Sequence, residues 1–170
     1  MDVSEQEAKL TLRLAQLEKH ERCQEDFLIF VKNMWPDFIA GRHHKIIAEK
    51  LERVAKGDLK RLIINMAPRH TKSEFASFLF PAWMMGRNPK MKIIQATHTT
   101  ELAVNFGRKT KNLIDSDDYK DIFPTVNLSA DSKASGRWDT TSGGMYYAVG
   151  VGSNLAGRGG DLVIIDDPHS

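Results

Sequence analysis

Apolar residues recur with helical spacing in four segments of the chain. Leu10, Leu14 and Leu17 form one narrow stripe in a charged stretch without glycine or proline, which predicts a helix over residues 4–25. Further helices are predicted over residues 41–57, 72–85 and 99–114, each bounded by residues that start or stop helices. The first stripe spans too few heptads to favour a coiled coil, so we expect an arm that packs on its own domain or on a neighbour.

Short apolar runs alternate with these helices. Buried strands are predicted over residues 61–66, 92–97 and 162–165, and the glycines near residue 143 indicate a hairpin within residues 138–151. Residues 115–134 are turn-rich and predicted to be mostly irregular, and the glycine-rich residues 150–160 are expected to form a mobile loop. Strands that alternate with helices predict an α/β fold whose sheet contains parallel strands.

Composition narrows the class of protein. The 170 residues are 41% hydrophobic and carry 24 Lys+Arg against 22 Asp+Glu, as in a globular domain and unlike a disordered chain or a highly basic nucleic-acid coat. The single cysteine, Cys23, excludes an internal disulfide and a zinc site of several thiolates. No apolar run approaches the roughly 20 residues that span a bilayer, and the N-terminus does not resemble a signal peptide, so we expect a cytosolic protein without a membrane partner.

The segment after the strand at residues 61–66 carries the first candidate chemistry. A phosphate-binding loop needs inward N–H groups, a helix N-terminus, a lysine for the β- and γ-phosphates and a hydroxyl for Mg²⁺. Lys72 and Ser73 occupy the last two positions of the GxxxxGK[ST] pattern, whereas Met66 and Thr71 replace its glycines. Alone, this match is also compatible with the solvated first turn of a helix. The candidate nucleotide-binding residues are Pro68, Arg69, His70, Thr71, Lys72 and Ser73.

Two adjacent carboxylates, Asp166 and Asp167, directly follow the last apolar strand. In P-loop enzymes the first acid at such a strand end belongs to the Mg²⁺ shell, and a second orients the attacking water. Successive side chains of a strand point to opposite sides, so the two acids are able to do different work. By itself the Asp-Asp-Pro sequence is as well explained as a polar turn. The two acids and the pair Lys72 and Ser73 support each other, however. The pair opens a helix and the acids end a strand, which are the positions that ATP hydrolysis by a P-loop enzyme requires.

Two arginines are candidates for stabilising phosphate charge. Arg158 lies in a glycine-rich loop, from which it either reaches a γ-phosphate on a neighbouring subunit or remains solvated. Arg69 lies in the candidate phosphate loop and would act in its own subunit. His70, beside it, is either a phosphate contact or an exposed loop side chain.

The remaining aromatic and histidine residues leave two interpretations open. One is an edge that receives an adenine ring, formed by Trp35, Pro36, His43 and His44. The other, for Trp35, is packing in the core. Adjacent histidines on a helix point in different directions, and the other histidines are scattered, so we predict no zinc site. Cys23 has no His-Asp partner set nearby in sequence, which argues against a nucleophile.

Several of these segments together resemble the large terminase subunits of tailed double-stranded DNA phages, the ATP-driven motors that pump a genome into an empty capsid. The resemblance covers residues 27–170 and is carried by a Trp-Pro segment, a His-rich helix start, PRHTKSE, IIQATHTTELA and LAGRGGDLVIIDDPHS. It implies a P-loop NTPase fold of the ASCE type, with a mainly parallel sheet flanked by helices. It also implies a helical arm at residues 1–26 and a partial ATPase domain at residues 27–170.

The resemblance implies ATP and Mg²⁺ as ligands. Lys72 would contact the β- and γ-phosphates, Ser73 and Asp166 the metal, and Asp167 would activate the attacking water. Family members often carry glutamate where this chain has Asp167 and glycine where it has Thr71.

The arginines also have counterparts in the family. Arg158 resembles the arginine finger supplied to the adjacent subunit of a ring, and Arg69 the arginine that acts in its own subunit.

The family further implies partners: double-stranded DNA held through its phosphates, a portal protein, a small terminase subunit, and further copies of the chain in a ring on the procapsid, in the host cytoplasm.

Full-length terminases continue into a nuclease domain, so we expect this chain to be truncated on its C-terminal side, without nuclease activity, and marginally soluble through an exposed sheet edge. Two alternatives are another P-loop NTPase, such as a helicase-like enzyme, and a P-loop remnant that binds partners without hydrolysing ATP.

Overall fold

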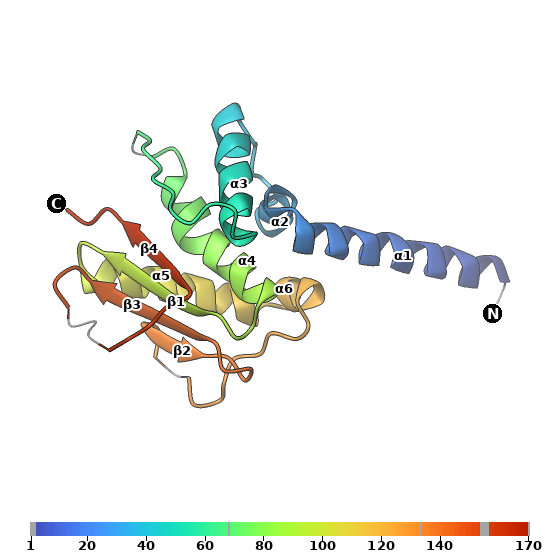
Figure 1. Cartoon of the computed structure of the whole chain (residues 1–170). Coiled ribbons are helices and arrows are strands. Elements are labelled where there is room, and N and C mark those ends of the chain that lie inside the picture. The colour runs from blue at the N-terminus through green and yellow to red at the C-terminus, as the bar shows by residue number, and fades with distance from the viewer. Residues whose placement is uncertain (1–2, 68, 133, 154–156, 170) are drawn as a thin grey trace.

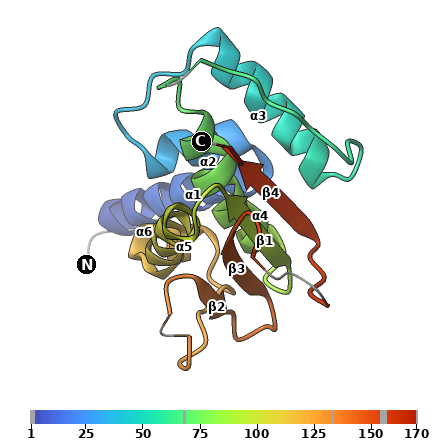
Figure 2. The same ribbon diagram turned by 90° about the vertical axis from the view of Figure 1, so that its left-hand side faces the viewer.

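A mainly parallel sheet forms one layer of the fold, as the computed structural model of residues 3–67, 69–132, 134–153 and 157–169 shows (Figures 1 and 2). Its strand order is β2–β3–β1–β4. β3 and β4 run parallel to β1 on either side of it, and β2 is antiparallel to β3. The strands are β1 (Lys92–Thr97), β2 (Arg137–Asp139), β3 (Met145–Gly150) and β4 (Leu162–Asp166). This confirms the predicted mixed α/β class with a mostly parallel sheet.

The helices agree with the sequence pattern in four places. They are α1 (Val3–Glu25), α2 (Phe27–Met34), α3 (Arg42–Ala55), the π-helix η1 (Glu74–Leu79), α4 (Phe80–Arg87), α5 (Thr100–Asp115) and α6 (Asp117–Ile122). The predicted helix over residues 72–85 is present, but its first part has the wider π-helical turn, a feature often found at functional sites. The Thr99 hydroxyl accepts a hydrogen bond from the Leu102 N–H and so caps α5.

One prediction about secondary structure was wrong. Residues 61–67 form no strand, and they pair with no strand among the described residues. Leu62, Ile64 and Met66 pack against the core, while the Ile63 side chain between them is 85% exposed. The segment at residues 115–134 is mostly irregular, as predicted, apart from α6, a helix of 6 residues that is too short to show a period.

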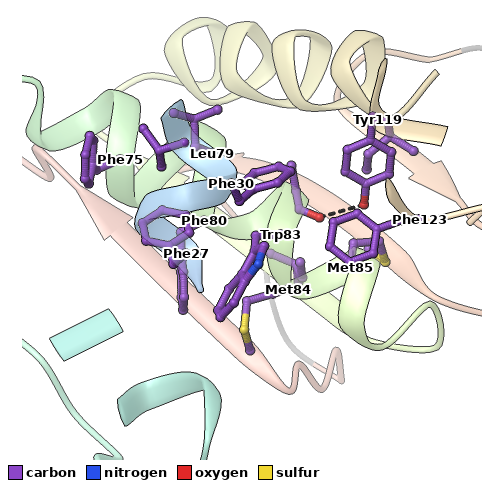
Figure 3. Close-up of a cluster of buried hydrophobic side chains, with 14 of the residues drawn as sticks. Phe27, Phe30, Phe75, Leu79, Phe80, Trp83, Met84, Met85, Tyr119 and Phe123 are labelled. Atoms are coloured by element: carbon purple, nitrogen blue, oxygen red, sulfur yellow. Dashed lines mark hydrogen bonds between the residues drawn. The ribbon is translucent and has the colours of Figure 1, made fainter. Parts of the chain in front are cut away.

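The main core lies between the helices and one face of the sheet. The Phe27 ring of α2 is surrounded by Phe75, Phe80 and Trp83 from η1 and α4, with ring centroids 5.4–5.7 Å apart (Figure 3). Aromatic contacts of this kind bury large apolar areas and fix the angle between helices. They join the first helices of the domain to the helix that follows the candidate phosphate loop.

Two buried polar contacts connect distant helices within this core. The Trp83 indole N–H donates to the Cys23 carbonyl oxygen at 2.9 Å and ties α4 to the end of α1. The Tyr119 hydroxyl of α6 donates to the Ala82 carbonyl at 2.7 Å (Figure 3), and burial raises the pKa of Tyr119. Each contact gives a buried side-chain donor a partner inside apolar surroundings, where an unpaired polar group is costly.

The other face of the sheet is covered much less. Ile94, Ala96 and Val149 form a small cluster there with Tyr147, and no helix residue of the described chain belongs to it. β4 is an edge strand, and its Ile165 side chain is 64% exposed. The edge strand therefore presents apolar side chains to solvent, whereas the small cluster on the face itself is buried.

The N-terminal helix projects from the rest of the molecule (Figure 1). Its last turns pack on the domain, where Cys23 is fully buried, whereas Leu10, Leu14 and Leu17 are exposed. The stripe therefore does not pack on its own domain, and packing on a neighbour stays a prediction. Among the described helices, none is both long enough and apolar enough to cross a membrane.

Gly86 offers a test of the packing between α4 and the segment after α6. A Cβ added at Gly86 would lie 2.5 Å from a ring carbon of Phe123. We expect Gly86→Ala to lower the free energy of unfolding by about 1–2 kcal/mol, because overpacking outweighs the better helix propensity of alanine. Denaturant titration followed by circular dichroism measures this. Gly159→Ala is the control, since its Cβ meets nothing within 4 Å, and equal effects of the two changes would contradict the packing.

Candidate functional site

The candidate site lies at the carboxyl edge of the parallel strands. Thr97 of β1 is in register with Asp166 of β4 and with Gly150 of β3, so the three strands end together. Open α/β sheets bind ligands at this edge. A pocket of about 340 Å³ opens here between the loop before η1 and the end of β4. It is lined by Met66, Ala67, Arg69, His70, Thr71, Lys72, Ser73, Glu74 and Asp167.

Lys72 connects the loop to both carboxylates at the strand end. Its Nζ lies 2.9 Å from Asp167 Oδ1 and 3.6 Å from Asp166 Oδ1. The hydrogen bond to Asp167, together with the charges of the two carboxylates, raises the pKa of Lys72 against the opposing effect of burial. The lysine is therefore a stable cation, held where the helix begins and the strand ends.

Asp166 has a second partner that sequence reasoning missed. Its carboxylate, which is 6% exposed, accepts a hydrogen bond through Oδ2 from the buried Ser77 hydroxyl of η1 at 2.8 Å. A buried carboxylate needs such partners, because desolvation without them costs several kcal/mol. The one available signal was spacing: Ser77 follows Ser73 by four residues, which places both on the same side of a helix.

The backbone of the pocket is strained. Among the described residues, Arg69 (φ 65°), Thr71 (φ 62°) and Asp167 (φ 41°) are the non-glycine residues with positive φ, and all three line this pocket. Each such residue costs on the order of 1–3 kcal/mol, and such strain gathers at functional sites. Thr71 thus adopts the left-handed conformation that glycine would adopt without strain.

His44 is buried next to the candidate phosphate loop and does not line the pocket. Its Nε2 is 2.6 Å from the Thr71 hydroxyl, and its Nδ1 accepts a hydrogen bond from the Gly41 N–H at 2.9 Å. Burial, and then the neighbouring His43 and His70, lower the pKa of His44. No local pattern indicates the contact with Thr71, which lies 27 residues further along the chain.

The two interpretations of Trp35 are now distinguishable. Its ring contacts Phe38, with centroids 5.1 Å apart, and Trp35 packs against the main core. The structure therefore shows core packing for Trp35. His43 stays exposed beside His44, with ring centroids 3.8 Å apart.

The structure separates the two candidate arginines. Arg69 lines the pocket, whereas the Arg158 guanidinium lies over the Tyr147 ring, 4.3 Å from its centroid, on the sheet face without helices. Arg158 is therefore not part of the pocket in its own chain, and its contact with a neighbouring subunit stays a prediction. Pro68 lies outside the described residues, and His70 lines the pocket.

The donor groups at the site are compatible with Mg²⁺ bound to a nucleotide. No group of three or more His, Cys, Asp or Glu side chains able to hold a metal occurs among the described residues. Mg²⁺ at a nucleotide needs fewer protein ligands, since phosphates and water supply most of its oxygens. The Ser73 hydroxyl at the pocket and the Asp166 carboxylate at the strand end are oxygen donors of the required kind.

Comparison with known proteins identifies no relative of this chain. No family model matches it, and neither the curated proteins nor the solved structures that were searched contain a match. The interpretation of the pocket therefore depends on its own geometry and on the sequence motifs.

Proposed function

We propose that this chain is the ATPase part of a phage large terminase subunit and hydrolyses ATP to drive double-stranded DNA into a procapsid. The observation that carries the proposal is the position of Lys72. It opens a helix at the carboxyl edge of a parallel sheet, 2.9 Å and 3.6 Å from the two adjacent carboxylates that end β4. The P-loop fold and the terminase assignment are supported by the motifs and their order along the chain.

In this proposal Lys72 binds the β- and γ-phosphates. Phosphate oxygens that enter the pocket would replace Asp167 as its closest anionic partners, and their negative charge would favour the charged lysine as the carboxylates do now. Arg69 lines the same pocket and supplies a second positive charge in its own subunit. Arg158 is proposed to act on the nucleotide of a neighbouring subunit.

The two carboxylates have different surroundings and therefore different proposed roles. Asp166 is buried and oriented by Ser77, which suits the metal shell that it would form with Ser73. Mg²⁺, when bound there, neutralises the charge that develops on the phosphates. The side chain of Asp167 is exposed and is proposed to orient the attacking water.

The intact machine is proposed to contain a ring of such chains together with a portal protein and a small terminase subunit. It would work in the host cytoplasm, transiently on the procapsid. Contacts with DNA would be made mainly to phosphates and would weaken as salt rises.

A P-loop remnant without hydrolysis is the second candidate function. Thr71 favours it, because its Cβ lies where backbone N–H groups would have to approach phosphate closely. The two candidates differ in whether the folded chain binds Mg·ATP and turns it over.

The role of Lys72 is tested by titration calorimetry with Mg·ATP. We expect the wild-type chain to bind and Lys72→Ala to abolish binding, because the variant loses the cation that faces the phosphates. Lys120→Ala is the matched control, since Lys120 pairs with Asp115 at 2.7 Å on the surface, away from the pocket. Equal binding by the wild type and Lys72→Ala, or no binding by a folded wild-type chain, would refute the ATPase proposal.

Ser77 gives a separate test of the metal shell. Ser77→Ala removes the hydroxyl donor of a buried carboxylate, so we expect the free energy of unfolding to fall by about 1–3 kcal/mol. We also expect a smaller gain in ATP affinity on addition of Mg²⁺, with affinity in EDTA unchanged, because Asp166 loses its fixed orientation. An unaltered gain from Mg²⁺ would show that the contact between Ser77 and Asp166 serves stability alone.

A further inference from the structure

We infer that His44 is a positioning residue that holds the candidate phosphate loop in its left-handed conformation at Thr71. The inference starts from a continuous chain of hydrogen bonds. The Gly41 N–H donates to His44 Nδ1, His44 Nε2 lies 2.6 Å from Thr71 Oγ1, and the Thr71 hydroxyl donates to the His70 carbonyl. One imidazole thus connects the first turn of α3 with the loop that lines the pocket.

The direction of each hydrogen bond follows from chemistry. A backbone N–H is only a donor, so Nδ1 accepts from Gly41 and carries no proton. A neutral imidazole then carries its proton on Nε2, which donates to the Thr71 oxygen. That oxygen in turn uses its own proton for the His70 carbonyl. The arrangement therefore requires the neutral Nε2–H form of His44.

The ring of His44 is well placed to act as a fixed support. It is 6% exposed and lies against Phe75 and Phe38, with ring centroids 5.1 Å and 4.7 Å away. Phe75 belongs to the helix that the loop opens, and its N–H donates to the Thr71 carbonyl at 3.0 Å. The histidine is consequently immobilised against the same helix whose first residues it helps to position.

Thr71 needs such support more than glycine would. A β-branched residue at φ 62° is an outlier of backbone conformation, and it persists only where its surroundings fix it. The segment before the loop gives no help from a sheet, since residues 61–67 pair with no strand among the described residues. Glycine at position 71 would adopt this conformation without strain. It would also lack the hydroxyl that contacts His44, so the loop would neither have nor need this support.

The test is a double-mutant cycle with His44→Gln and Thr71→Gly. Glutamine at this position of α3 is able to accept the Gly41 N–H, as in a capping box, but its amide does not also reach Thr71. We expect His44→Gln to weaken Mg·ATP binding about tenfold in the wild-type background and less than about twofold in the Thr71→Gly background. Equal losses in both backgrounds would overturn the inference, and so would no loss in the wild type.

Thr71→Val gives a second variant that leaves α3 untouched. It keeps the branched Cβ but removes the hydroxyl, so it is expected to weaken binding as His44→Gln does. Combination of the two changes should add less than about twofold to either one, because both remove the same contact. Full additivity of their effects would contradict the pairing.

The expected change in affinity rests on the proposed function, so one readout is independent of nucleotide. ¹⁵N NMR of the His44 ring should show the Nε2–H tautomer, and amide exchange at residues 71–73 should speed up in His44→Gln but not in the double variant with Thr71→Gly. A chain that binds no Mg·ATP but passes this test would refute the ATPase proposal and keep the role of His44. A different tautomer, or unchanged exchange in His44→Gln, would refute that role whatever the chain binds.

Discussion

The buried charge of Asp166 is the constraint that the rest of the site depends on. Its place at the end of β4 is set by parallel pairing with β1, in register with Thr97. An unpaired carboxylate in such a place is costly, so other residues must supply a hydrogen bond or a positive charge to it. Ser77 donates a hydrogen bond to it and Lys72 forms an ion pair with it, and both residues belong to the same loop and helix. The start of that helix is thereby anchored to the carboxyl edge of the sheet, which is why loop and carboxylates share one pocket.

This anchoring also explains where the strained backbone lies. Lys72, the residue after Thr71, reaches the carboxylates with its side chain, so the chain must turn sharply just before it. Asp167 turns as well, and its carbonyl accepts a hydrogen bond from the His98 N–H at 3.0 Å. Strained residues persist when neighbouring contacts fix them from several sides. The energy stored in these turns is offset by contacts that converge on one pocket, which is the arrangement expected of a binding site.

The sequence was sufficient for features that depend on local pattern. The position of β1, the cap at Thr99 and the carboxylates at the end of β4 were all predictable, because each is specified within a few residues. The contacts of Ser77 with Asp166 and of His44 with Thr71 span 89 and 27 residues. They arise from the path of the chain in three dimensions, and no local period records them.

The segment 61–67 shows why an apolar run that does reach the core need not form the strand it predicts. The apolar run at residues 61–66 predicts a buried strand, and three of its side chains, Leu62, Ile64 and Met66, do pack against the core. It does not predict a partner strand, and the described chain supplies none. The chain therefore reaches the π-helix from a segment that no strand among the described residues holds in place. Side-chain contacts must set the conformation of the candidate phosphate loop instead. The hydrogen bond from His44 of α3 to Thr71 therefore contributes more to this conformation than it would in a loop that follows a paired strand.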